Sequence, residues 1–239
     1  MPHTHPHTTP HTTKVFDLEL EQLADNIRVM GRFAGTQFTD AVKSLLQGDT
    51  ALAHQVVDQD QQLDAMRHAL SASAALVIVR RQPVAIDLDE TLVDLRIVED
   101  LERIGDLAKN IAKRVIALAG ASIPADLAIK MDQLATLAAN QLQRALDTFL
   151  ARDADEALVV RQQDEAVDEL HTLLFREIVA HMGEGSMPTI HFVHLLFTAK
   201  NIERVGDHAA HVAEAAYIKA TGRRPDTERR RLDESSSTQ

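Results

Sequence analysis

The 239-residue chain has no cysteine and no tryptophan, and only one tyrosine and seven phenylalanines. Without cysteine it cannot form disulfides, thiolate metal sites, iron–sulfur clusters or a cysteine nucleophile. The shortage of aromatic residues argues against a β-sandwich or β-barrel, whose strands are rich in aromatic and β-branched side chains. Nine glycines and seven prolines are few breakers for this length. The composition therefore favours long, uninterrupted helices.

Acidic residues outnumber basic ones by 36 to 25, which gives a formal net charge of −11. This sign disfavours nucleic-acid binding, which depends on a cationic surface, and it suits metal cations or a basic partner surface. The longest nearly apolar stretch, residues 69–79, is much shorter than the roughly 20 residues of a membrane-spanning helix. The N-terminus has no signal-peptide pattern. We expect a cytoplasmic protein that reaches a membrane only through partners.

Turn-forming residues divide the chain into six segments, most of them about thirty residues long. Within the segments, apolar residues recur every three or four positions, as in amphipathic helices. Asp49 and Asp153 stand where each can cap the helix that follows. Pro124 and Pro188 suit the first turn of a helix, where a missing N–H is tolerated. The pattern predicts six helices and essentially no strand.

The second half of the chain repeats the first. The segment LLQGDTALAHQVVDQDQQLD from Leu45 aligns with FLARDADEALVVRQQDEAVD from Phe149 at an offset of 104, and LERIGD from Leu101 aligns with IERVGD from Ile202 at an offset of 101. We therefore expect an all-α fold of two tandem three-helix bundles related by internal duplication, at residues 14–121 and 122–222. Disordered tails are expected at residues 1–13, rich in His, Thr and Pro, and at 223–239. A six-helix solenoid would fit the same spacing.

Four carboxylate pairs, each with a spacing of four residues, recur at matched positions in the two halves: Asp60 and Asp64, Glu102 and Asp106, Asp164 and Asp168, and Glu203 and Asp207. On a helical wheel the LERIGD and IERVGD pairs lie opposite the apolar stripe. Like charges one turn apart repel by a few tenths of a kcal/mol. A solvated acidic surface is one interpretation. The other is a shared metal site, since carboxylate oxygens suit Mg, Mn and Fe ions. Glu99 and His211 are weaker candidate ligands.

Gly105 and Gly206 lie between the apolar stripe and the acidic face of their predicted helices. Each costs about 1 kcal/mol relative to alanine in a helix interior. A missing side chain at these positions would let a neighbouring backbone approach beside the carboxylates. Simple close packing of helices explains the two glycines equally well.

Known catalytic patterns are missing from the sequence. There is no Glu-x-x-His pair of the kind that ferritin-like di-iron enzymes use, no phosphate-binding glycine loop and no nucleophile next to a base. We therefore expect a protein that is not an enzyme, with no catalytic residues.

With the paired E-R-x-G-D motifs of the duplicated chain in view, the sequence resembles the PhoU family of phosphate-transport accessory proteins. The resemblance extends from about Phe16 to Gly222 and includes Arg81-Gln-Pro83 and Asp60-x-x-x-Asp64. It implies two three-helix bundles and multinuclear metal clusters, with iron or zinc among the metals, on the [ED]-x-x-x-D motifs. The eight carboxylates named above match those motifs. The two halves are not identical beside these motifs, since Lys200 stands at the position of Glu99 and His211 at that of Asn110.

The resemblance also implies a function. Members act as negative regulators of the phosphate-starvation response and link the ATP-binding subunit of the phosphate ABC transporter to a phosphate-sensing histidine kinase. We expect the same signalling role here, in a homodimer. Two alternatives stay open at this point, a metal-dependent phosphoesterase and a metal-storage helical bundle. The metal, whether Fe, Zn, Mn or Mg, is not determined by the sequence.

Overall fold

The computed structural model describes residues 14–81, 86–185 and 187–225. These ranges contain no strand and seven α-helices: α1 (Lys14–Gln47), α2 (Thr50–Arg81), α3 (Ile86–Leu118), α4 (Ala125–Ala151), α5 (Ala154–Gln162), α6 (Asp164–Glu184) and α7 (Thr189–Thr221). The all-α prediction is confirmed. The tail predicted at residues 1–13 lies outside the described residues, as do residues 226–239 of the tail predicted at 223–239 and Gln82 and Pro83 of the family-like stretch.

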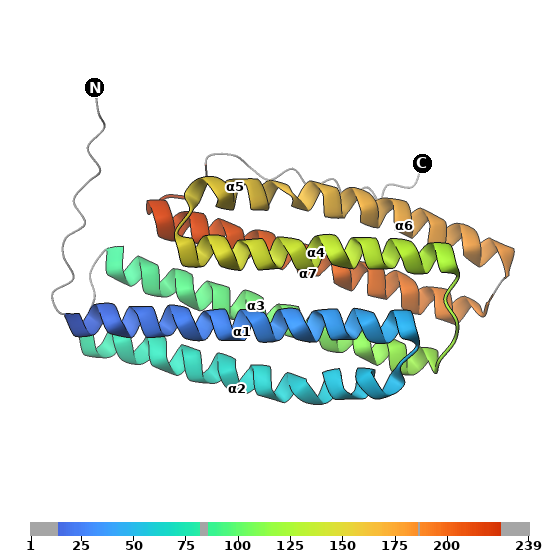
Figure 1. Ribbon diagram of the computed structural model, residues 1–239, viewed down its shortest axis with the longest axis horizontal. Helices are drawn as coiled ribbons and strands as arrows, with labels where there is room; N and C mark the ends of the chain where they lie inside the picture. Colours follow the sequence, from blue (N-terminus) through green and yellow to red (C-terminus); the bar gives the residue numbers. More distant parts are fainter. Residues whose placement is uncertain (1–13, 82–85, 186, 226–239) are drawn as a thin grey trace, which may run out of the picture.

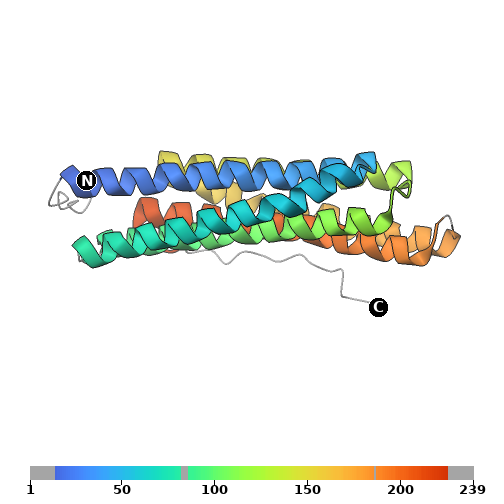
Figure 2. The ribbon, with the colours of Figure 1, turned by 90° about the horizontal axis from the view of Figure 1, so that it is seen from below.

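The helices form two groups that lie side by side with their long axes nearly parallel (Figures 1 and 2). Helices α1, α2 and α3 pack against one another, and α4 packs with α5, α6 and α7. Between the groups, α3 packs against α7 and α1 packs against α4. The fold is therefore two tandem three-helix bundles, with α5 and α6 together forming the middle helix of the second. Helices α3 and α7, which carry the repeated motifs, meet at the junction of the bundles.

The apolar stripes predicted from helical spacing form the core. Leu101, Ile104 and Ile111 of α3 are completely buried, as are Ile202, Val205 and Val212 of α7. Burying one apolar side chain of this size stabilises the folded state by about 1.5–3 kcal/mol. No helix in the described part of the chain carries an apolar stretch of the length that crossing a membrane requires.

The two bundles begin their middle helices in the same way. Asp49 Oδ1 accepts a 2.9 Å hydrogen bond from the N–H of Leu52, and Asp153 Oδ1 accepts a 3.0 Å bond from the N–H of Glu156. Both predicted N-caps are therefore present. The residue before each cap adopts the left-handed conformation, with φ of 65° at Gly48 and 53° at Arg152. For a residue with a side chain, such as Arg152, the left-handed conformation costs about 1–2 kcal/mol. The Arg152 guanidinium forms two hydrogen bonds with Glu90 of the other bundle.

The segment predicted as a single fifth helix is divided into α5 and α6, which lie end to end (Figure 1). Gln163 keeps helical dihedral angles, with φ −62° and ψ −17°. Its N–H is shared between the carbonyls of Val159 and Val160, at 3.3 and 3.2 Å. Such sharing tightens the turn towards 3₁₀ geometry without reversing the chain. The described ranges thus contain seven helices where six were expected, and the second bundle still has three helical segments packed side by side.

Candidate functional site

In the first bundle, the predicted carboxylates of α2 and α3 meet around one lysine. Lys109 Nζ lies 2.6 Å from Asp60 Oδ2 and 2.7 Å from Asp106 Oδ1. Asp60 is nearly buried, and the Lys109 side chain is 22% exposed. Although burial opposes it, the two carboxylates raise the pKa of Lys109 above its usual value. The ammonium therefore stays charged and neutralises part of the cluster.

Two arginines lie against the other carboxylates of the first bundle. Arg67 of α2 approaches Glu99 at 3.6 Å and Glu102 at 4.0 Å, while Arg103 approaches Glu102 at 3.5 Å and Asp106 at 3.3 Å. Burial and the neighbouring Asp106 raise the pKa of Glu102 above its ordinary value. The remaining paired carboxylate of the first bundle, Asp64, is half-buried one turn after Asp60.

The acidic residues of the second bundle are more deeply buried. Asp164, Asp168 and Glu203 are each no more than 3% exposed, and Asp207 is half-buried. Glu203 Oε1 accepts a 2.7 Å hydrogen bond from Lys200, whereas its buried Oε2 has no hydrogen-bond partner among the described residues. Burial, together with the carboxylates of Asp207 and Asp168, raises the pKa of Glu203 to about 7 against the opposing effect of Lys200.

The two bundles differ in the cations near these carboxylates. At the offsets of the repeat, Ala210 of α7 takes the place of Lys109, and His171 of α6 takes the place of Arg67. His171 is buried, with 2% of its surface exposed. The lysine that bridges two carboxylates in the first bundle therefore has no counterpart at the matching position in the second. The cation paired in the second cluster is instead Lys200, which lies 2.7 Å from Glu203.

A buried glutamine in each bundle escaped the sequence analysis. Gln37 Nε2 donates to the carbonyl of Val56 at 3.1 Å, and Gln141 Nε2 donates to the carbonyl of Val160 at 3.4 Å. The two glutamines are 1% exposed, and their positions differ by the same 104 residues as the repeat. A polar residue duplicated within an apolar stripe was the signal that could have revealed them.

The glycines of the repeated motif lie directly against these glutamines. A Cβ atom on Gly105 would lie 3.1 Å from Gln37 Oε1, and one on Gly206 would lie 3.2 Å from Gln141 Oε1. On Gly206 it would also lie 3.3 Å from Asp164 Oδ1, and Gln141 Nε2 lies 3.5 Å from the same oxygen. The missing side chain thus admits a polar group beside the second cluster. Both glycines also pack closely against aliphatic side chains, so the neighbours that approach them are side chains and not the backbone that the sequence predicted.

The two weaker candidate ligands lie in different surroundings. Glu99 is more than half exposed and faces Arg67. His211 lies 3.5 Å from Asp100 of α3. His208, its neighbour on α7, donates a 2.8 Å hydrogen bond to the same Asp100 oxygen.

Among the described residues, Asp100, His208 and His211 are the one set of three metal-ligating side chains whose donor atoms all lie within 4.8 Å of one another. The eight paired carboxylates do not form such a set with the side chains as they lie. Their role as ligands stays a prediction.

The PhoU domain model matches the chain twice, over residues 27–115 and 131–216. The chain is 44% identical over 237 residues to the phosphate-specific transport system accessory protein PhoU homolog of Rhizobium meliloti, a match that covers 99% of this chain and 98% of that protein. The chain belongs to the PhoU family. The resemblance drawn from the E-R-x-G-D motifs is therefore confirmed.

Other PhoU proteins agree with this assignment. The homolog of the same name from Caulobacter vibrioides is 37% identical over 92% of this chain and 96% of its own length. The crystal structure of PhoU from Pseudomonas aeruginosa is 33% identical, covers 87% of this chain and all of its own, and gives a TM-score of 0.83. The PhoU regulatory protein from Streptococcus pneumoniae, 24% identical with a TM-score of 0.81, shares the fold.

Proposed function

We propose that the protein is a negative regulator of the phosphate-starvation response and of phosphate uptake. In this role it acts in the cytoplasm as an adaptor, without catalysis of its own, between the ATP-binding subunit of a phosphate ABC transporter and a sensor histidine kinase. The observation that carries the proposal is the 44% sequence identity, over nearly the full length of both chains, to a protein named for the phosphate-specific transport system. Two homologous bundles in one chain offer two related surfaces, which suits a protein that contacts two partners.

A deletion strain tests the regulatory role. We expect a phosphate-starvation reporter to stay on in phosphate-rich medium when the gene is deleted, and to be switched off again by the wild-type gene. Unchanged reporter expression in a strain that has no second copy of the gene would contradict the proposal. Recovery of the transporter's ATP-binding subunit and of the kinase with the affinity-tagged protein tests the adaptor role, and analytical ultracentrifugation tests the expected homodimer.

The acidic cluster of the second bundle favours a metal-binding role within this function. The fit is supported by the unpartnered Oε2 of the buried Glu203 and by Ala210, which stands where Lys109 neutralises the first cluster. The residues that would hold a divalent ion are Asp164, Asp168, Glu203 and Asp207. Carboxylate oxygens would select Mg, Mn or Fe, and the bound cation would relieve the repulsion between these groups.

Paired variants separate the two clusters. Equilibrium dialysis measures the Mn²⁺ binding of each variant. The double variant Glu203→Gln with Asp207→Asn is expected to lose most of the Mn²⁺ binding of the wild type. The matched change in the first bundle, Glu102→Gln with Asp106→Asn, is expected to remove less. Equal binding by both variants and the wild type would exclude the carboxylates as ligands. Turnover of a phosphoester by the Mn²⁺-loaded protein would favour the phosphoesterase alternative.

A further inference from the structure

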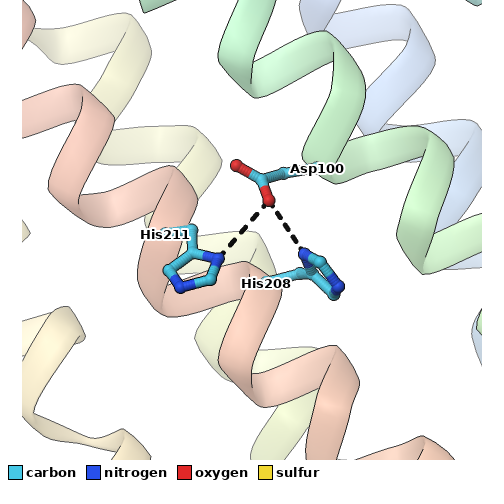
Figure 3. Close-up of side chains that lie close together, drawn as sticks. All are labelled: Asp100, His208 and His211. Atoms are coloured by element: carbon cyan, nitrogen blue, oxygen red, sulfur yellow. Dashed lines mark hydrogen bonds and ion pairs between the residues drawn. The ribbon is translucent and has the colours of Figure 1, made fainter.

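Two histidines of the second bundle and an aspartate of the first converge at the junction of the bundles. Figure 3 shows Asp100 of α3 pointing between His208 and His211, which project from successive turns of α7. Asp100 Oδ1 lies 2.8 Å from His208 Nδ1 and 3.5 Å from His211 Nδ1. The imidazole rings are 5.6 Å apart between centroids and nearly perpendicular, at 84°.

These separations match those of ligands around a small transition-metal ion. Zinc binds His nitrogen and carboxylate oxygen at about 2.0–2.2 Å in tetrahedral geometry, which places neighbouring ligand atoms about 3.3 Å apart. The observed 2.8 and 3.5 Å lie on either side of that value. The donor atoms of the two imidazoles lie within 4.8 Å of each other, so side-chain rotations would bring all three ligands to a common ion. Two imidazoles and one carboxylate also leave a fourth position open for water.

Charge and access suit the same ion. His208 and His211 both approach the same carboxylate oxygen of Asp100, which brings negative charge to the site. Asp100 and His211 line a groove between α3 and α7, whose other charged residues are Glu99, Glu214 and Arg96, so carboxylates outnumber cations there. His211 is 45% exposed at this groove, so an ion can enter from solvent.

The set of ligands is particular to this junction. At the matching positions of the repeat, His208 corresponds to Leu107, His211 to Asn110 and Asp100 to Asn201. The duplication therefore does not produce a second copy of the cluster. The Asp100, His208 and His211 cluster therefore occurs once in the chain, whereas the paired carboxylates occur in both bundles.

We propose that Asp100, His208 and His211 form a binding site for a divalent transition-metal ion of the Zn²⁺ type. Imidazole nitrogen selects such an ion over Mg²⁺ and Ca²⁺, which prefer oxygen ligands. Because α3 belongs to the first bundle and α7 to the second, the ion ties the two bundles together. Bound zinc then stabilises the folded chain in proportion to its occupancy.

Zinc titration of the full-length protein, in competition with a chromophoric chelator, tests the site. His3, His5, His7 and His11 are changed to serine in every variant, because imidazole is a zinc ligand and four histidines close together in the sequence would compete with the site. In this background we expect one Zn²⁺ per chain at the junction, and at least a tenfold to hundredfold loss of affinity in His211→Asn, about what disturbing a ligand's surroundings alone costs. The substitution installs the residue found at Asn110 of the first bundle. The exposed His54→Asn is the matched control and is expected to bind as the parent does.

Two further results decide between this site and the acidic cluster. Glu203→Gln with Asp207→Asn is expected to leave the high-affinity zinc in place, whatever it does to Mn²⁺ binding. If that variant loses the zinc while His211→Asn keeps it, the junction site is excluded. X-ray absorption at the zinc edge of the parent protein, which needs no ligand variant, should reveal two imidazole ligands. A shell of oxygen atoms alone would overturn the proposal, as would a thermal stabilisation by zinc that is equal in His211→Asn and the parent.

Discussion

Lys109 of α3 and Asp60 of α2 are joined by a 2.6 Å ion pair. The ammonium also contacts Asp106, so a side chain of the protein occupies the point where the carboxylates of the two helices converge. In the second bundle the matching residue is Ala210. The first cluster thus holds a lysine between the carboxylates of its two helices, whereas the cation paired in the second cluster is Lys200, at Glu203. This difference determines the first expected result.

Exchanging the residues at these two positions should exchange the metal-binding properties of the bundles. Lys109→Ala is expected to destabilise the metal-free protein by about 1–3 kcal/mol, since it leaves partly buried carboxylates without their partner, and to create an additional Mn²⁺ site. Ala210→Lys is expected to weaken Mn²⁺ binding in the second bundle. Equilibrium dialysis and urea unfolding measure both effects. The exposed Lys113→Ala, one turn further along α3, is the control, and a similar loss of stability there would count against a specific role for Lys109.

The motif glycines should respond to alanine according to the space around them. A Cβ atom on Gly105 would lie 2.0 Å from Cδ2 of the buried Leu63, so Gly105→Ala is expected to cost about 1–3 kcal/mol through overpacking. That exceeds the gain of about 1 kcal/mol from better helix propensity. Gly183 of α6 has no atom within 4 Å of the added carbon, and Gly183→Ala should stabilise the protein by up to about 1 kcal/mol. Urea unfolding that shows the same sign for both variants would refute this account.

The buried pair between Asp94 of α3 and Lys219 of α7 joins the two bundles. Lys219→Met should cost about 3–5 kcal/mol, because it leaves a carboxylate buried without its cation. Asp94→Leu combined with Lys219→Met should restore most of that stability, since an apolar pair replaces the charges. Thermal and urea unfolding of the single and double variants measure the difference. A double variant no more stable than Lys219→Met would disprove the explanation.

The same aspartate should give the protein a specific pH dependence. Burial raises the pKa of Asp94 more than Lys219 lowers it. The folded state therefore keeps a proton that the unfolded state has already lost. The stability from this group is fully present below the ordinary aspartate pKa of about 3.9 and is lost as pH rises through the raised folded pKa. The stability of the wild type relative to Asp94→Asn should accordingly fall as pH increases above about 4, and a constant or rising difference would contradict the assignment.

The two N-caps offer a test of equivalence between the bundles. Asp49→Ala and Asp153→Ala should each cost about 0.5–2 kcal/mol, because each leaves the first N–H groups of its helix without an acceptor. Asp58→Ala, at an exposed interior position of α2, should change stability by less than about 0.5 kcal/mol. Urea unfolding of the three variants makes the comparison, and equal losses in all three would show that capping is not the cause.

Much of the fold follows from local rules that the sequence states directly. The apolar stripe through Leu101 and Ile104 predicted the buried face of α3, and the aspartates at positions 49 and 153 predicted two helix starts, because periodicity and capping depend on neighbours within a turn or two. The duplication predicted two bundles of the same plan. The tight turn at Gln163 escaped prediction, since no glycine or proline marks it.

The sequence by itself determined which residues carry charge and which helical face each occupies. Only the tertiary structure decided which charges meet. Lys109 neutralises Asp60 because α2 and α3 pack at one particular register. His211, one turn from Asp207 in sequence, instead lies beside Asp100, more than a hundred residues earlier. Such pairings depend on how whole helices pack across the bundle, and the spacing of residues along one helix contains no information about its neighbour.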